Sequence, residues 1–168
     1  MRKNAGYIMK DYSLLIADFY EAFRRKDYKC MQQCYSNDAR FNDPVFQNLD
    51  AHEVKAMWEM LCLNAKDFEL TYNHVKSDGE IGSAEWIARY TFSTTGKKVI
   101  NRIKSTFNFK DGKIIEHKDD FNFYSWSSQA LGLPGIILGW TPVIKRKVRM
   151  KARRSLEKFM ESNGYNPG

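Results

Sequence analysis

Residues 39–46 place a carboxylate beside a proline within a short, largely apolar stretch of strand character. Pro44 has no N–H group to donate to a sheet ladder, so the strand must end or lie at an edge at Asp43. Apolar neighbours raise the pKa of a carboxyl group, because burial disfavours its charged form. Asp43 is therefore either an acceptor for backbone N–H groups in a turn or a group that transfers protons.

His117 and Asp119 form a second pair that could do chemistry. Side chains two residues apart share one face of a strand and lie roughly 7 Å apart along it. Both could therefore contact one ligand or one water molecule in proton transfer or hydrolysis. Each also has a structural explanation, His117 as a hydrogen-bonded core histidine and Asp119 as a buried, paired acid.

The sequence predicts neither a metal site nor a cofactor. Three cysteines are present, and no His or Cys partners accompany them at metal-ligating spacing. We interpret Cys30, Cys34 and Cys62 as free core thiols in a reducing compartment. The first residues are not followed by an apolar signal region, so we expect an intracellular, cytoplasmic protein.

Three helices are predicted ahead of the strands. Apolar residues recur on one face from position 8 to 23, as in a long amphipathic helix. A shorter helix passes through positions 31–35. Asp50 and Glu53 have the spacing of a capping box and begin a third helix, whose apolar face includes Trp58.

Beyond Asp67 the apolar period changes to two, which indicates strands. They are predicted at 69–76, 80–93, 98–110 and 113–124, with hairpin signals at Asp78-Gly79, Thr95-Gly96 and Asp111-Gly112. Helices followed by an antiparallel meander predict an α+β fold. We expect a cone-shaped, strongly curved antiparallel sheet wrapped around the three N-terminal helices.

The inward faces of these strands combine apolar and polar residues. The last strand would present Ile115, His117, Asp119, Phe121 and Phe123; the strand before it Val99, Asn101, Ile103, Ser105, Phe107 and Phe109; and the 80–93 strand Trp86, Ala88, Tyr90 and Phe92. Unpaired polar groups are costly in a solid core, so we predict an enclosed pocket for a hydrophobic small molecule. The alternative is one internal hydrogen-bond network without a cavity. The predicted ligand-binding residues are Phe19, Trp58, Trp86, Tyr90, Asn101, Ser105, Phe107 and Phe121.

The net charge of +7 is concentrated near the C-terminus. Between Pro142 and Met160 lie eight basic residues and one acid, so the rest of the chain is balanced. This distribution gives no support to nucleic-acid binding by the main body. We divide the chain into a domain at 1–124 and an extension at 125–168.

The extension begins with an apolar segment, residues 131–140, that Gly and Pro interrupt too often for a membrane span. An amphipathic basic helix with Ile144, Val148, Leu156 and Phe159 follows. One interpretation is weak contact of residues 142–160 with an anionic membrane surface. The sequence favours the other: the apolar segment closes the mouth of the cone or supports a dimer, and the helix packs over it.

The chain resembles the nuclear transport factor 2-like superfamily over about residues 8–124. The resemblance rests on the order of elements, on the Asp-Pro strand and on the ending His117-Lys118-Asp119-Asp120-Phe121. The resemblance is closest to its SnoaL-like and ketosteroid-isomerase-like branch. It implies the cone fold, a pocket bounded by the helices and the concave sheet, and a homodimer formed through the outer face of the sheet.

Ketosteroid isomerases use the Asp of an Asp-Pro pair as general base, and Asp43 matches it. Their oxyanion hole needs a tyrosine on the first helix and an aspartate on the sheet. The matching positions hold Phe19 and Ser105, and Tyr20 should point elsewhere around the helix. The resemblance therefore argues against steroid isomerase chemistry.

Limonene-epoxide hydrolases use an Asp-Arg-Asp triad, of which Asp119 matches only the last member. The other two positions fall near Trp86 and Ala88. SnoaL-like cyclases need only one buried acid or base near a carbon acid.

The leading hypothesis is a pocket protein that binds a hydrophobic small molecule and, as an enzyme, performs cofactor-free proton transfer (isomerase or cyclase) or hydrolysis. Asp43 is its base, and His117 and Asp119 orient the ligand or a water molecule. The alternative is a non-catalytic binding or scaffold module, peripheral to a membrane through its basic helix. The sequence does not indicate the substrate.

Overall fold

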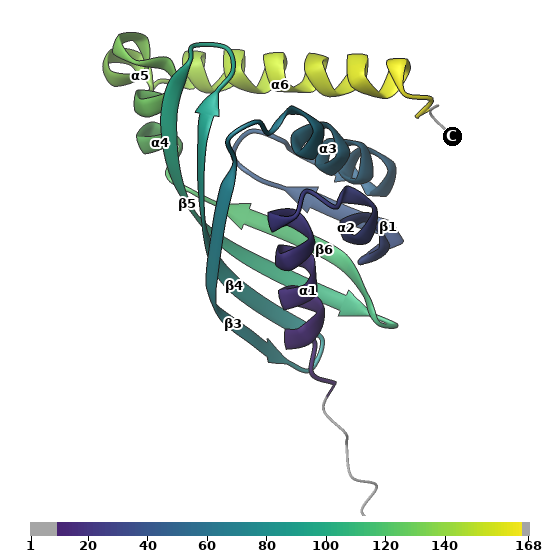
Figure 1. Cartoon of the computed structure of the whole chain (residues 1–168). Coiled ribbons are helices and arrows are strands. Elements are labelled where there is room, and N and C mark those ends of the chain that lie inside the picture. The colour runs from purple at the N-terminus through teal and green to yellow at the C-terminus, as the bar shows by residue number, and fades with distance from the viewer. Residues whose placement is uncertain (1–9, 166–168) are drawn as a thin grey trace, which may run out of the picture.

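The computed structural model describes residues 10–165, which form six helices and one six-stranded sheet (Figure 1). The elements are α1 (Ser13–Arg24), α2 (Tyr28–Gln33), β1 (Tyr35–Asn42), β2 (Leu49–Asp50), α3 (Ala51–Asn64), β3 (Glu69–Asp78), β4 (Ile81–Phe92), β5 (Lys97–Lys110), β6 (Lys113–Asp120), α4 (Phe123–Leu131), α5 (Leu133–Leu138) and α6 (Pro142–Ser162).

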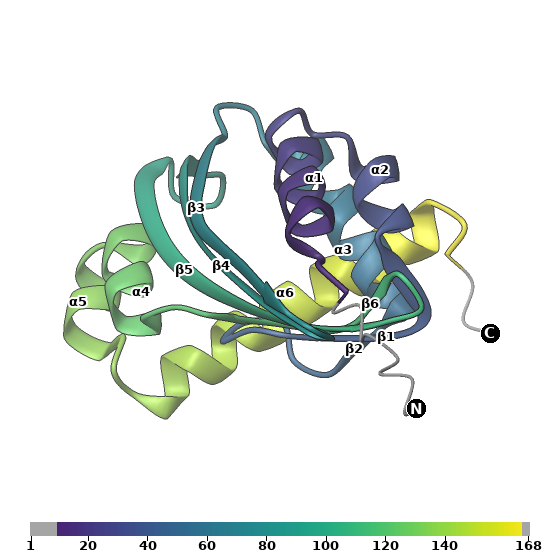
Figure 2. The same cartoon turned by 90° about the horizontal axis from the view of Figure 1, so that it is seen from below.

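The sheet is curved and mixed, with strand order β2-β1-β6-β5-β4-β3. The meander from β3 to β6 is antiparallel throughout, as predicted, and β1 pairs parallel to β6. Helices α1 to α3 lie on the inner side of the curve, whereas α4 and α5 lie beyond β5 (Figure 2). The predicted α+β cone with three N-terminal helices is confirmed. The sheet is mixed and not wholly antiparallel, because β1 pairs parallel to β6, and β2, α4 and α5 are elements that the sequence did not predict.

Helix α1 is buried over a wide arc because the curved sheet and the other helices enclose it. Ile16, Phe19, Tyr20 and Phe23 are all within the core. Tyr20 was expected to point away from the site, and that expectation is wrong: its side chain is fully buried.

The capping box predicted at the start of α3 is confirmed. The Asp50 carboxylate accepts from the backbone N–H groups of His52 and Glu53, and the Glu53 side chain accepts from the backbone N–H of Asp50. This cap fixes the point at which the chain leaves β2 and brings Trp58 into the core.

Three local predictions are corrected. Tyr35 begins β1 and does not belong to the second helix. In β6 the buried residue is Ile114 and not Ile115, because a bulge shifts the register there. The last strand ends at Asp120, since Asn122 caps α4 by accepting from the backbone N–H of Ser125. Position 8, predicted to start the first helix, lies outside the described residues.

Helix α6 carries the basic segment and packs against the main body. Leu156 is fully buried in the core, and Arg153 forms an ion pair with Glu53 of α3. Ile144 and Val148, at the other end of the helix, pack with Trp126 of α4. Among the described residues no helix combines the length and hydropathy needed to cross a membrane.

Candidate active site

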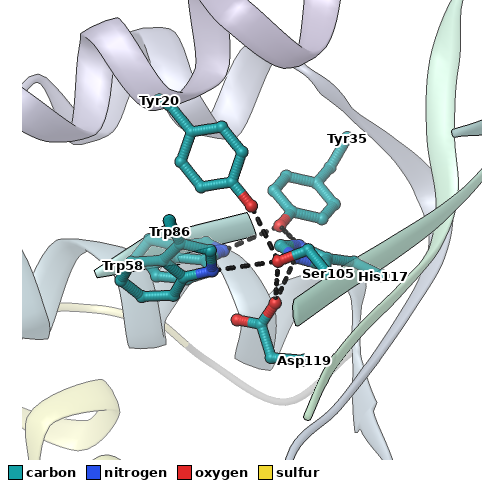
Figure 3. A network of polar contacts seen from close by, with 7 residues as sticks. All are labelled: Tyr20, Tyr35, Trp58, Trp86, Ser105, His117 and Asp119. Carbon is teal, nitrogen blue, oxygen red and sulfur yellow. Dashed lines mark hydrogen bonds and ion pairs between the residues drawn. The ribbon is translucent and has the colours of Figure 1, made fainter. Parts of the chain in front are cut away.

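Asp119 is the end point of a buried hydrogen-bond network between α1 and the sheet (Figure 3). Its Oδ1 atom accepts from the Ser105 hydroxyl and lies 3.0 Å from His117 Nε2. Ser105 Oγ in turn accepts from the Tyr20 hydroxyl at 2.7 Å and from Trp86 Nε1 at 2.9 Å. The β5–β6 pairing, which sets Ser105 opposite Asp119, brings the two together.

The other side of the network passes through His117 to Tyr35. His117 Nδ1 lies 2.6 Å from the Tyr35 hydroxyl, which accepts from Trp58 Nε1 at 2.9 Å. An indole N–H can only donate, so the Tyr35 proton is available for Nδ1. His117 then carries its proton on Nε2 and donates it to Asp119. In this assignment each donor has one acceptor, and the network converges on a carboxylate.

The two tyrosines of the network are held as proton donors. Burial raises the pKa of Tyr20 and of Tyr35 well above the ordinary value, and the charge of Asp119 raises both further. Both hydroxyls therefore stay protonated over the range in which proteins fold.

The interior of the cone is filled by this network and by aromatic rings. Phe19 packs edge to face on Trp58 and His117, and the rings of Phe107 and His117 are tilted with 4.3 Å between their centroids. All four residues are buried. Two hollows on the described residues lie on the outer surface, one along α6 and one between β1 and β6. The packing of these inward-facing side chains therefore favours an internal hydrogen-bond network over an enclosed pocket at the centre of the cone.

Asp43 lies just beyond the end of β1, at the rim of this network. The parallel register pairs Phe41 with His117 and Asn42 with Lys118, so Asp43 and Asp119 each directly follow the last pair between the two strands. Asp43 Oδ1 accepts from the backbone N–H of Val45 at 2.6 Å and of Phe46 at 2.5 Å. The turn before Pro44 is therefore closed by the carboxylate, while Oδ2 has no hydrogen-bond partner among the described residues.

The environment of Asp43 sets its pKa at about 7. Burial is the largest cause and raises the pKa, and the charge of Asp119 raises it further. The N–H bonds from Phe46 and Val45 and the charge of Arg149 act in the opposite direction. A carboxyl with this pKa can both take and return a proton near neutral pH.

A second apolar cluster, which includes Val45 and Tyr90, lies beside Asp43, and we call this side of the molecule the mouth of the cone. Tyr90 and Phe121 are half-buried and pack against both this cluster and the core. The Tyr90 hydroxyl accepts from Trp126 Nε1 of α4 at 2.8 Å. Arg149 of α6 donates from Nε to the Pro44 carbonyl oxygen at 2.9 Å. Helices α4 and α6 therefore cover the side of the cone on which Asp43 lies.

The predicted site residues divide into two groups. His117, Asp119 and Ser105 form the network, and Phe19, Trp58, Trp86 and Phe107 surround it. Asp43, Tyr90 and Phe121 lie at the mouth, and Asn101 is half-buried on β5.

Sequence reasoning missed Tyr20, Tyr35 and Arg149. The alternation of apolar residues along 35–41 could have indicated that Tyr35 begins an inward-facing strand. Nothing in the sequence distinguishes Arg149 from the seven other cations of its helix, because its contact with Pro44 depends on how α6 packs.

No cluster of three or more His, Cys, Asp or Glu side chains that could hold a metal occurs within residues 10–165. The three cysteines are free. Cys34 and Cys62 are buried, whereas Cys30 is exposed and corrects the expectation that all three are core thiols.

Comparison with known families agrees with this architecture. The model of the SnoaL-like domain family matches residues 16–117, more than half of the chain. The chain belongs to this family. The match ends before α4, so the three C-terminal helices of this SnoaL-like protein lie outside the part that defines the family. The comparison with curated protein sequences gave no match.

Solved structures share the fold of this SnoaL-like protein at low sequence identity. An LEH-like epoxide hydrolase of M. tuberculosis is 16% identical, with 73% of this chain and 92% of that chain covered and a TM-score of 0.58. IdmH of Streptomyces antibioticus, a candidate polyketide cyclase, is 22% identical, with 72% and 98% covered and a TM-score of 0.60. A protein of Catenulispora acidiphila with a ketosteroid isomerase-like fold, in complex with trimethylamine, is 12% identical, with 76% and 97% covered and a TM-score of 0.62. The predicted resemblance to the nuclear transport factor 2-like superfamily is thus confirmed for the fold.

Proposed function

We propose that this SnoaL-like protein binds a hydrophobic carbonyl compound at the mouth of the cone and catalyses cofactor-free proton transfer with Asp43 as general base. The observation that carries the proposal is the Asp43 carboxyl itself: a raised pKa of about 7, one oxygen held by two backbone N–H groups and the other without a partner among the described residues. Membership of the SnoaL-like family and the fold shared with a candidate polyketide cyclase support the reaction class.

The chemistry needs only the substrate and this chain. Asp43 Oδ2 takes a proton from a carbon next to a carbonyl group, and the C–H electron pair becomes part of an enolate. For an isomerase, the proton returns to another carbon of the same conjugated system. For a cyclase, the enolate carbon attacks a second carbonyl carbon, a C–C bond forms, and the proton passes to the new alkoxide. In both cases Asp43 ends as it began.

Tyr90 is suited to stabilise the oxyanion of that enolate. Its hydroxyl accepts from Trp126, and no described residue accepts its own proton. Burial is the main cause of its raised pKa; the Trp126 bond lowers the pKa, and the charge of Asp43 raises it. A protonated phenol beside the base can donate to the substrate oxygen as negative charge develops there.

Asp119 and His117 are positioning residues in this proposal. Both His117 ring nitrogens are engaged inside the protein, so it acts on the ligand only through Asp119. Asp119 accepts from Ser105 and contacts His117, and its charge helps to raise the pKa of Asp43. The proposed setting is a cytoplasmic homodimer formed through the outer face of the sheet.

The test is deuterium exchange into a hydrophobic ketone. In heavy water, the protein should catalyse incorporation of deuterium beside the carbonyl of β-tetralone, measured by proton NMR. Asp43→Asn keeps the acceptor for Val45 and Phe46 and should lower the rate about 100-fold or more. Asp38→Asn, at an exposed position of the same strand, should leave the rate unchanged. Exchange retained in Asp43→Asn would exclude Asp43 as the base.

The second candidate function is ligand binding at the mouth without chemistry, which the internal engagement of His117 and Asp119 by hydrogen bonds supports. Native mass spectrometry of the purified protein separates the two. A co-purified hydrophobic ligand that β-tetralone displaces, together with a rate of exchange equal to the uncatalysed one, would establish binding alone.

A further inference from the structure

Helix α5 and the start of α6 expose a group of large apolar side chains. Each is between 47% and 73% exposed: Leu133, Ile136, Ile137, Leu138, Trp140 and Val143. Both views place α5 at the outer end of the molecule, beyond β5 and at the N-terminal end of α6 (Figures 1 and 2). We call these six residues the apolar tip. The sequence-based expectation that this segment closes the mouth of the cone is therefore wrong.

Two glycines, Gly135 within α5 and Gly139 at its C-cap, explain why the apolar face of α5 points outward. A Cβ atom added at Gly135 would lie 1.9 Å from the carbonyl oxygen of Ser127, and one at Gly139 would lie 2.3 Å from the Ser127 hydroxyl oxygen. Only glycine allows this close approach of α5 to α4. The face without side chains is thus packed against α4, and the large apolar side chains are left on the other face.

The apolar face of α6 is not available for a further partner. Leu156 is fully buried, Phe159 packs against the core, and Ile144 and Val148 pack in the cluster at the mouth. Any contact of α6 with a membrane surface would therefore not use its own apolar face. What α6 presents outward is its basic side.

That outward side carries a regular stripe of cations. Lys147, Lys151, Arg154 and Lys158 line an open groove along α6 together with Met150 and Ser155. Their spacing of three to four residues sets them on one helix face. Val143, four residues before Lys147, belongs to the same face, so the stripe runs directly into the apolar tip. Lys97 adds a further cation, since its side chain lies next to Gly132 at the start of α5.

We propose that the apolar tip inserts into the surface of an anionic lipid membrane while the cation stripe of α6 contacts the lipid headgroups. Apolar side chains at the interface and cations beside them are the two features that peripheral membrane contact requires. Trp140 is of the residue type that prefers the headgroup level. Glu157 is near the stripe but is paired with Arg153, so it leaves the positive charge of the groove largely intact.

Binding to lipid vesicles tests both halves of the proposal. The purified full-length chain should sediment with vesicles of equal phosphatidylcholine and phosphatidylglycerol, and about ten-fold less with phosphatidylcholine alone. High salt should weaken the binding. Replacing three stripe residues, Lys147→Gln, Lys151→Gln and Arg154→Gln, should reduce affinity about ten-fold or more.

The apolar tip is tested separately. Ile136→Ser with Ile137→Ser should lower affinity about ten-fold or more, because burial of both side chains in the interface is lost. The matched control is Leu14→Ser with Leu63→Ser, two exposed apolar residues of α1 and α3. The control for charge is Arg25→Gln, Lys29→Gln and Lys66→Gln, three exposed cations outside both the sheet and α6. Both controls should bind as the unmodified protein does.

Trp140 supplies a direct signal, because it is exposed and the other three tryptophans are buried. Its emission should shift to shorter wavelength on anionic vesicles and be quenched by brominated lipid, and Trp140→Phe should abolish the shift. The proposal would be overturned if every variant bound neutral vesicles as strongly as anionic ones. It would also be overturned if the protein self-associated and the Ile136 and Ile137 replacements abolished that association. A third contrary result is binding to duplex DNA that depends on the cation stripe but not on the apolar tip.

Discussion

Asp43 and Asp119 directly follow Asn42 and Lys118, respectively, the last residues that pair between β1 and β6, and the charge of Asp119 helps to raise the pKa of Asp43. Asp119 accepts two hydrogen bonds on one oxygen, whereas Asp43 is bound only by the N–H groups of its own turn. Because their environments differ, the two carboxyl groups are suited to different roles. Asp119 is held by hydrogen bonds inside the protein, and Asp43 is able to exchange a proton near neutral pH.

The first prediction concerns the pH dependence of exchange. Because Asp43 must be ionised to act as a base, the rate should rise with pH around a midpoint near 7, the pKa of its carboxyl. Asp119→Asn removes a negative charge, so the pKa of Asp43 and the midpoint should both move to lower pH. Carbon NMR of the labelled Asp43 carboxyl measures this directly. An unchanged midpoint would contradict the electrostatic relationship.

The second prediction concerns stability. The pKa of Asp43 is raised on folding from 3.8 to about 7, so the native state binds a proton that the unfolded chain has lost between these values. Its contribution to stability is complete below pH 4 and is lost as the pH rises through 7. Asn does not titrate, so the Asp43→Asn variant does not lose this contribution. Relative to the unmodified protein, its free energy of unfolding should therefore increase by up to about 4 kcal/mol as the pH rises over this range.

Urea unfolding at a series of pH values provides the measurement. Asp38→Asn, on the exposed part of β1, is the matched control and should follow the unmodified protein at every pH. A constant difference between Asp43→Asn and the unmodified protein would mean that Asp43 has an ordinary pKa in the folded state.

The third prediction concerns Ser105, the residue through which two donors reach Asp119. Ser105→Ala leaves the Tyr20 hydroxyl and Trp86 Nε1 buried without an acceptor and should cost about 2–4 kcal/mol of the free energy of unfolding. Tyr20→Phe removes one donor only and should cost about 1 kcal/mol. Thr106→Ala, exposed on the same strand, should cost about 0.5 kcal/mol or less. Equal costs for all three would argue against a connected network.

The fourth prediction concerns the attachment of α6. Leu156→Ala creates a cavity where α6 meets the core and should lower the free energy of unfolding by about 2–5 kcal/mol in a single transition. Met150→Ala, at an exposed position of the same helix, is the control and should have little effect. If Leu156→Ala matched Met150→Ala, α6 would not belong to the cooperative unit of the cone.

The local sequence determined the elements of this protein well. Period-two alternation, the turn glycines and the Asp50–Glu53 cap each act through residues a few positions apart, and the helices, the meander and the inward rows of β4 and β5 followed from them. Asp43 was recognised for the same reason, because Pro44 ends a strand whatever surrounds it. The errors at Tyr35 and Ile115 arose where a bulge changed the period.

Only the tertiary structure decided which side chains meet. The parallel pairing of β1 with β6 brings Asp43 and Asp119 to the same end of the two strands, and periodicity does not predict the register between strands so far apart in the chain. Tyr20 was predicted to point away from the site, but because α1 is enclosed on more than one side, its hydroxyl donates to Ser105. The apolar segment that was predicted to close the mouth of the cone is instead an exposed tip, because Gly135 approaches Ser127 closely. Each outcome depends on packing between distant segments, whereas composition and spacing encode only the nearest neighbours.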